Sequence, residues 1–472
     1  MESLASSIQP EVVPLNVLDT QGSFSNIPFV FFYENKAGEA DFMQADLLRD
    51  SFYRMLRFFP MLVGHVKSKG FGNVSVVIDP ANLNAPDYSE DSSDVHFDEL
   101  KAAGFRWSAW PEGVATAGPM VKADKKGVIR LINVHVVRLK ENSGVMVYFS
   151  IPHYVVDGES HMEVMRRWCK IYELMRAGEQ DAVDALPGYG FDRAVIKGSL
   201  PKERAPLDDE TRAGFSDSTY MSEWFSWISP KLRGYILSKV TGRQHAEAHL
   251  FHVSAATFES LRTALREHVP GIDDLPVNEI LYALVSKTLV QSQILAGYGG
   301  KGGATTMIAV VFELRKVLGL DHKDFIGNVL MPKLTLQSTE ELGQPTSAET
   351  LAQTINANAD IVRSVSAPQV GSFVDMVLAQ PSAFTRPVVR YLPNKTAISF
   401  VYDLMPNMYE ADFGYGRPEW VSPIEPFRAH ACLLLTPRDP TDGFDVFLTA
   451  FPDVMKEVLK NEYWTDVAQL IY

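Results

Sequence analysis

The chain has 472 residues, of which 46% are hydrophobic and 22% are charged, a composition typical of a globular protein with large apolar cores. Its formal net charge is −14 and it has no long basic run, so a general nucleic-acid-binding protein is disfavoured. Two cysteines, Cys169 and Cys432, are too few for a disulfide framework and fit a reducing compartment. The N-terminus does not resemble a targeting peptide, and no segment approaches the roughly 18 apolar residues of a membrane span. We therefore expect a cytoplasmic protein.

The first part of the chain alternates between predicted strands and helices. A helix is expected within residues 45–66, because apolar side chains recur at helical spacing until Pro60 ends the helix. A second helix with one apolar side is expected after Asp157-Gly158, through Leu174. Short runs of β-branched and aromatic residues predict strands at 27–34, 73–79, 129–139 and 144–151.

Residues 186–246 differ in composition from the parts on either side. They are rich in proline, glycine and charge and have little periodicity, which indicates a long connection between two lobes. A second series of elements then begins. Strands are predicted at 248–254, 307–315, 329–336 and 444–451, and helices at 255–269, 276–295 and 348–365.

Mixed strands and helices in both halves predict an α/β fold with two lobes of similar size. We expect an N-terminal lobe at residues 1–185, the crossover connection at 186–246 and a C-terminal lobe at 247–472. Because a cleft between lobes is a common place for a substrate site, we expect the active-site channel at the junction of the two lobes.

The stretch FSIPHYVVDGES contains the strongest candidate for chemistry. A predicted strand ending at Ile151 puts His153 on a turn at the rim of a sheet. A neutral imidazole can take a proton from a hydroxyl at cellular pH. Asp157 can orient the turn or meet a cation from elsewhere, and Gly158 permits a backbone conformation that is closed to other residues. Taken alone, the pattern is also compatible with an ordinary histidine beside a turn.

Two motifs resemble those of a known family. HYVVDG, residues 153–158, resembles the His-x-x-x-Asp-Gly motif of the CoA-dependent acyltransferases. ADFGYGRPEWV, residues 411–421, resembles the Asp-Phe-Gly-Trp-Gly motif of their BAHD branch, with Tyr415 in the tryptophan position, which varies in the fungal branch. Further similar segments lie in the same order at 17–19, 47–66, 276–287, 311–330 and 398–414. The chain therefore resembles a BAHD acyltransferase with the chloramphenicol acetyltransferase-like fold.

The resemblance implies roles for the residues of the first motif. His153 would remove a proton from an acceptor hydroxyl or amine, which attacks the thioester carbonyl of acyl-CoA. Asp157 would point away from the substrate and pair with an arginine of the second lobe, for which Arg315 is the candidate. Gly158 would be structural. Acyl-CoA would be a cosubstrate, and no metal and no permanently bound cofactor is implied.

The second motif and one departure from the family carry further expectations. Asp412, Gly414 and Gly416 would shape a loop far from the chemistry, although Asp412 is sometimes treated as functional. Phe400 stands where many members have a tryptophan whose N–H can donate toward the oxyanion, and phenylalanine has no such donor. Ser399, a backbone N–H or a water would have to replace it.

Other functions stay open at this point. Peptide-synthesis condensation domains share the fold, but Pro152 before the histidine, the DFGYG segment and a chain without a carrier domain favour a BAHD enzyme. A binding protein of the same fold without turnover is the non-enzyme alternative. An aromatic cluster at residues 220–230 either anchors the connection or walls an acceptor site. We expect a monomeric transferase that acylates a small secondary metabolite.

Overall fold

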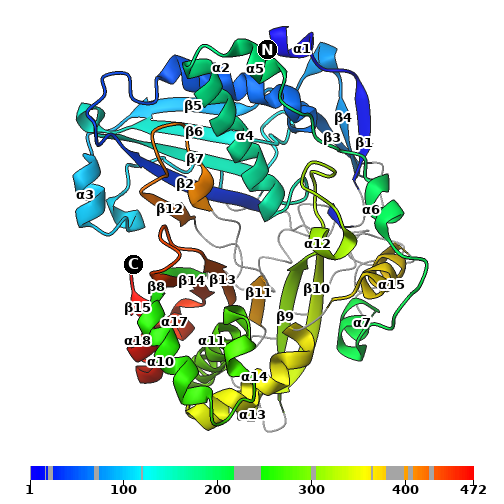
Figure 1. The fold of residues 1–472 in the computed structure, drawn as a ribbon, viewed down its shortest axis with the longest axis vertical. Helices are drawn as coiled ribbons and strands as arrows, with labels where there is room; N and C mark the ends of the chain where they lie inside the picture. The colour runs from blue at the N-terminus through cyan, green and yellow to red at the C-terminus, as the bar shows by residue number, and fades with distance from the viewer. Residues whose placement is uncertain are drawn as a thin grey trace.

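The computed structural model describes residues 2–15, 18–19, 25–68, 74–118, 121–216, 246–298, 304–362, 365–378, 398–401, 408–424 and 430–472. The chain forms two lobes, one above the other in Figure 1, and each is built on a sheet covered by helices. This arrangement confirms the α/β class and the two lobes predicted from the alternation of elements. Among these residues, no helix has both the length and the apolar character needed to cross a membrane.

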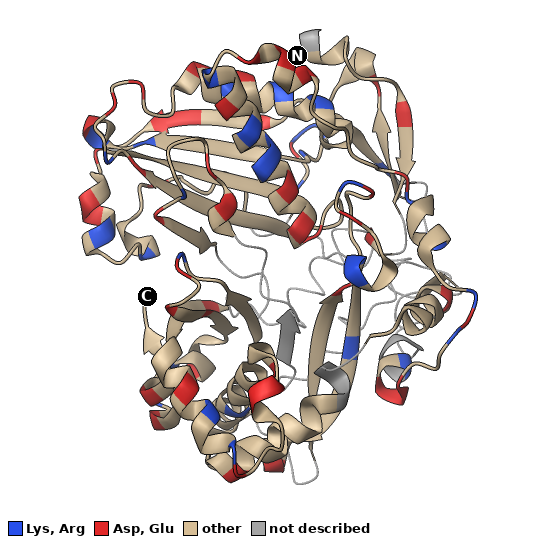
Figure 2. Ribbon diagram, viewed as in Figure 1, with Lys and Arg blue, Asp and Glu red and all other residues tan. Residues whose placement is uncertain are grey.

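The sheet of the first lobe has five strands. Its central strand β7 is buried along its whole length, as expected for a strand covered on both faces. Edge strand β5 is acidic and largely exposed, which Figure 2 shows as a red strand, and charge on an edge strand discourages pairing with another chain. The strand order is β12 (Trp420–Pro423), β2 (Asn26–Glu34), β7 (Gly144–Pro152), β6 (Asn133–Arg138) and β5 (Asp87–Ser92).

Two helices cover one face of this sheet. Trp168 of α4 (Gly158–Arg176) makes an edge-to-face contact with Phe52 of α2 (Ala45–Met55), with ring centroids 5.4 Å apart. The indole N–H donates to Ser51 Oγ at 3.0 Å, so the polar atom of this buried side chain is satisfied. The smaller elements of the lobe are α1 (Glu2–Ala5), α3 (Phe97–Ala102), α5 (Gln180–Asp184) and a three-stranded sheet of β1 (Glu11–Pro14), β4 (Val74–Ile78) and β3 (His65–Ser68).

The second lobe contains a seven-stranded sheet. Helix α11 (Val277–Leu295) is buried on nearly all sides, and its buried residues include polar ones such as Asn278 and Lys287. The strand order is β10 (Leu330–Ser338), β9 (Thr305–Glu313), β11 (Ile398–Val401), β13 (Ala431–Leu435), β14 (Gly443–Ala450), β8 (Glu247–Ser254) and β15 (Gln469–Leu470). The other helices are α10 (Ala255–Leu265), α12 (Arg315–Leu318), α13 (Thr339–Leu342), α14 (Ala348–Val362), α15 (Ala367–Leu378), α17 (Pro452–Val458) and α18 (Glu462–Val467).

One segment of the C-terminal half returns to the first lobe. Strand β12 pairs antiparallel with β2, with Trp420 opposite Phe32 and Pro423 opposite Phe29. Phe413, just before it, belongs to the hydrophobic core of the first lobe. A division of the chain at residue 247 therefore assigns this segment to the lobe in which it does not pack, because strand pairing joins distant parts of the sequence.

The described part of the connection, residues 186–216 and 246, contains short helices α6 (Ala194–Ser199) and α7 (Asp209–Ser216). Its start is fixed to the second lobe, because the N–H of Gly190 donates to Lys323 O at 2.8 Å and the N–H of Ile326 donates to Gly190 O at 2.9 Å. The aromatic cluster at 220–230 lies outside the described residues.

Candidate active site

His153 lies at the junction of the two lobes. It follows the last residue of β7, is half-buried, and its N–H donates to Ser25 O at 2.8 Å. Its Nδ1 lies 3.2 Å from Oδ1 of Asn328, and Nδ2 of Asn328 donates to the His153 carbonyl at 2.8 Å. Asn328 precedes β10 of the second lobe, so the histidine is held by hydrogen bonds from both lobes.

Asp157 starts helix α4 and reaches across to the second lobe. One carboxylate oxygen caps the helix by accepting from the N–H of Ser160 at 2.9 Å. The other accepts from Nη1 of Arg315 at 2.8 Å and from the N–H of Val329 at 3.0 Å. Burial alone would raise the pKa of Asp157, but the Arg315 guanidinium and these N–H groups hold it below its ordinary value. The aspartate is therefore an interlobe anchor that points away from solvent, with none of its surface exposed.

Arg315 is surrounded by further partners. Its Nη2 donates to Ser160 Oγ at 2.8 Å and to Gly327 O at 2.9 Å, and its Nη1 also donates to Glu313 at 2.7 Å. Burial raises the pKa of Glu313 to about 7, although Arg315 opposes the shift. The pair of Asp157 and Arg315 that the sequence suggested is thus one part of a larger buried network.

Gly158 differs from the sequence expectation. It is the first residue of α4 and has helical backbone angles, so it does not adopt a conformation closed to other residues. The capping carboxylate of Asp157 starts the helix at this point, and no left-handed residue is needed to turn the chain.

The DFGYG loop is closed by its own aspartate. Oδ1 of Asp412 accepts from the N–H groups of Gly414, Tyr415 and Gly416 at 2.7, 3.1 and 2.9 Å. Gly414 and Gly416 have φ of +84° and +97°, in the region that favours glycine. The three residues named from the sequence therefore come together, and their hydrogen bonds shape a loop.

This loop lies far from His153. Arg176, the last residue of α4, donates to Gly414 O at 2.9 Å, whereas Asp157 caps the first turn of the same helix. A helix of 19 residues is about 28 Å long. The five-stranded sheet also separates the loop from His153. The hydroxyl of Tyr33 donates to the Ala411 carbonyl, and Tyr33 pairs with Val145 at the start of β7, whereas His153 follows the last residue of β7.

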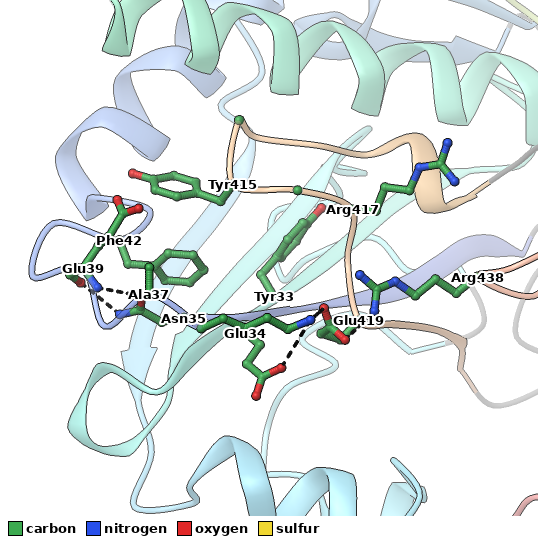
Figure 3. Close-up of a pocket in the computed structure, with 13 residues that line it drawn as sticks. Tyr33, Glu34, Asn35, Ala37, Glu39, Phe42, Tyr415, Arg417, Glu419 and Arg438 are labelled. Carbon is green, nitrogen blue, oxygen red and sulfur yellow. Dashed lines mark hydrogen bonds and ion pairs between the residues drawn. The ribbon is translucent and has the colours of Figure 1, made fainter.

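A pocket of about 190 Å³ lies beside the DFGYG loop (Figure 3). It is smaller than the roughly 300–1,000 Å³ of typical small-molecule sites. Two of its cations are already paired, because Lys36 and Arg438 both contact the carboxylate of Glu419. Its remaining lining residues are Tyr33, Glu34, Asn35, Ala37, Glu39, Phe42, Gly414, Tyr415, Gly416 and Arg417.

Other candidates from the sequence are less informative. Ser399 and Phe400 belong to strand β11, which pairs with β9. The structure describes the backbone of these two residues but not their side chains. Cys169 and Cys432 are buried, and burial raises the pKa of both thiols, which does not suit a nucleophile. Within the described residues, no group of three or more His, Cys, Asp or Glu side chains is placed to hold a metal ion.

Comparisons with known proteins decide the family. The family model described as "Transferase family" matches residues 4–464, nearly the whole chain. The chain belongs to this family, the BAHD acyltransferases. It is therefore an acyltransferase that uses acyl-CoA as its cosubstrate.

Individual relatives agree with this assignment. Phenolic glucoside malonyltransferase 2 of Arabidopsis thaliana is 23% identical over 461 residues, which cover 94% of this chain and 92% of the relative. The structure of F. graminearum TRI101 with ethyl coenzyme A has a TM-score of 0.71 at 14% identity and covers 98% of this chain and 100% of that chain. Vinorine synthase has a TM-score of 0.59 at 15% identity, with 95% of each chain covered. At these identities the two solved structures show a shared fold.

Proposed function

We propose that this protein acylates a hydroxyl group of a small acceptor molecule, with His153 as the general base. The observation that carries the proposal is the position of His153, half-buried at the junction of the lobes and hydrogen-bonded through Nδ1 to Asn328 of the second lobe. A base at such a junction can meet an acyl donor and an acceptor that approach from different sides.

The reaction follows from the chemistry of imidazole. Nε2 of His153 takes the proton from the acceptor O–H while the oxygen attacks the thioester carbonyl. The tetrahedral intermediate collapses, the C–S bond breaks, and the proton passes from the imidazolium to the CoA thiolate. Products are the acyl ester and free CoA, so the histidine ends in its starting state and no acyl-enzyme is formed.

The comparisons support the acceptor class. One similar structure is that of F. sporotrichioides TRI101 complexed with coenzyme A and T-2, and the relative from Arabidopsis thaliana is called a phenolic glucoside malonyltransferase. We infer a hydroxylated small molecule as the acceptor in this chain, with an amine as the alternative. The other expectations, a monomer in the cytoplasm acting in secondary metabolism, remain predictions.

Release of free thiol tests the proposal. Acetyl-, malonyl- and long-chain acyl-CoA are offered with a panel of hydroxylated acceptors, and ester formation is followed with thiol release. We expect His153→Ala to lower transfer at least about a hundredfold, with an unchanged unfolding transition. Near-normal transfer by this variant would refute the role of His153, and no thiol release by the wild type with any acceptor would favour a binding protein.

A second histidine provides the matched control. His252 is also half-buried and also makes a side-chain bond, with its Nδ1 2.7 Å from Asp445. It lies on β8, which is separated from β9 and the interlobe network by three strands. His252→Ala is expected to keep the wild-type rate of transfer.

A further inference from the structure

We propose that Asp19, held by Arg193, is a positioning residue that fixes the side-chain amide of Asn328 and thereby selects the tautomer of His153 with the proton on Nδ1. The inference rests on the proposed role of His153 as general base. It assigns a function to three side chains that have no place in either sequence motif.

The orientation of the Asn328 amide follows from its acceptors. One end of the amide lies 2.8 Å from the His153 carbonyl and 3.5 Å from Oδ1 of Asp19. A carbonyl and a carboxylate only accept, so this end must be the NH₂ group. The other end, Oδ1, faces Nδ1 of His153 at 3.2 Å. An amide oxygen only accepts, so Nδ1 carries the proton.

The tautomer has a direct consequence for the reaction. A neutral imidazole carries one proton, so a proton on Nδ1 makes Nε2 the basic nitrogen. A base must have its lone pair aimed at the acceptor before the hydroxyl arrives. The Asn328 amide keeps the lone pair on Nε2 only if the amide cannot rotate by 180°. A rotated amide would turn its NH₂ group toward Nδ1 and favour the opposite tautomer.

The His153 carbonyl and Asp19 both oppose that rotation, and Arg193 holds Asp19 in place. Oδ1 of Asp19 also accepts from the N–H of Asn328 at 3.0 Å, so the carboxylate holds both the backbone and the side chain of this residue. Arg193 donates from Nε to Oδ2 of Asp19 at 3.0 Å, and from Nη1 to the carbonyls of Phe191 and Ile326 at 3.0 Å each. Asp19 has none of its surface exposed and Arg193 has 7%.

The three positioning residues come from three parts of the chain. Asp19 precedes β2, Arg193 lies in the connection just before α6, and Asn328 lies just before β10. The contacts between them join the N-terminal segment, the connection and the second lobe at one point behind His153. The start of the connection is fixed at the same place, by the backbone bonds of Gly190 to Lys323 and Ile326 and by the bond from Arg193 to Ile326 O.

The ion pair of Asp19 and Arg193 also balances charge near His153. The charged or titratable groups near His153 include the pair Asp19–Arg193, the pair Asp157–Arg315 with Glu313 beside it, the neighbouring Tyr154, and His161 on α4. Both pairs combine one negative and one positive group. Asp19→Asn would leave the Arg193 guanidinium uncompensated, since a guanidinium keeps its proton in proteins, and a positive charge disfavours the imidazolium of His153.

Kinetics of Asp19→Asn test the inference. We expect kcat for acyl transfer to fall by about tenfold to a hundredfold, because the base is no longer held in position, while KM for acyl-CoA is unchanged. We also expect the acid limb of the profile of kcat/KM against pH to move to lower pH by about half a unit or more. Asp19→Asn/Arg193→Met removes both charges, so the limb should return toward the wild-type position while kcat stays low.

The matched control is Asp445→Asn, which removes another buried carboxylate, the one that pairs with half-buried His252. It is expected to change stability without moving kcat or the acid limb. If folded Asp19→Asn has the wild-type kcat and an unmoved acid limb, the inference is overturned. The proposed function stays intact in that case, provided that His153→Ala is inactive. Activity in His153→Ala would instead refute the proposed function.

A measurement on the unmutated enzyme covers the case in which Asp19→Asn fails to fold. With ¹⁵N-labelled histidine, the ring resonances of His153 are assigned by their loss in His153→Gln. At a pH where the ring is neutral, we expect Nδ1 in the protonated range and Nε2 in the unprotonated range. The reverse assignment would overturn the inference.

Discussion

The two motifs lie at opposite ends of helix α4 and use the same residue types in different ways. Asp157 accepts hydrogen bonds from Arg315 and Val329 of the second lobe, whereas Asp412 accepts from three N–H groups of its own loop. The first aspartate joins the lobes beside His153, and the second closes a turn at the far end of the sheet. An Asp-x-Gly or Asp-Gly pattern therefore does not identify a catalytic carboxylate by itself.

The largest effect is expected from Asp157→Ala. The substitution leaves the Arg315 guanidinium buried without its main interlobe partner, and breaking a buried pair from one side costs about 3–5 kcal/mol. Denaturant unfolding should show this loss, together with reduced soluble yield and reduced transfer. If the variant unfolds like the wild type but has no activity, Asp157 acts in the chemistry and the contrast between the two aspartates is wrong.

A smaller loss of stability is expected at acidic pH, because of a buried histidine on helix α4. His161 packs between Phe29 and Phe149, and burial lowers its pKa from 6.5 to about 3. The unfolded chain therefore binds the proton more readily, so stability is complete above pH 6.5 and falls as the pH decreases toward 3. At pH 5 the loss would be about 2 kcal/mol.

The variant His161→Phe checks this assignment. It should unfold with a weaker dependence on pH between 7.5 and 5 than the wild type. His252 offers the opposite sign, because its hydrogen bond to Asp445 raises its pKa. Its stabilising contribution is present below pH 6.5 and is lost as the pH rises. An unchanged pH dependence in His161→Phe would mean that another group titrates there.

The smallest effect is expected from Asp412→Ala. The loop would lose the acceptor for three N–H groups that are near solvent, so water can replace it in part, and the cost should be about 1–2 kcal/mol. Transfer per folded molecule should stay close to the wild-type rate, which thiol release would measure. A loss of activity as large as that of His153→Ala, in a folded protein, would place the second motif in the reaction.

Much of the fold could be predicted from local patterns. The strand before His153 and the helix after Asp157 follow from an apolar run, the Asp-Gly turn and helical spacing. Strand β5 was missed because its sequence, DYSEDS, is acidic and exposed at an edge and has no apolar alternation. The pairing of β12 with β2 was missed because four residues carry no signal for a partner almost 400 positions away.

The site could also be predicted only in part, because motifs mark some of its residues and not others. His153, Asp157 and Arg315 were found because motifs mark them. Asn328 and Asp19 lie in segments that resemble the family, but no local pattern shows that they meet behind His153. Arg193 lies in a connection rich in proline and glycine, where a buried arginine is not expected. Contacts between such distant positions exist only in the folded chain.

The most direct test of the central claim is a structure of the enzyme with CoA and an unreactive acceptor analogue. The account predicts Nε2 of His153 within about 3 Å of the acceptor hydroxyl, with the CoA sulfur on the other side of that oxygen and Nδ1 still bonded to Asn328. A complex in which the CoA sulfur and the acceptor meet away from His153 would contradict it.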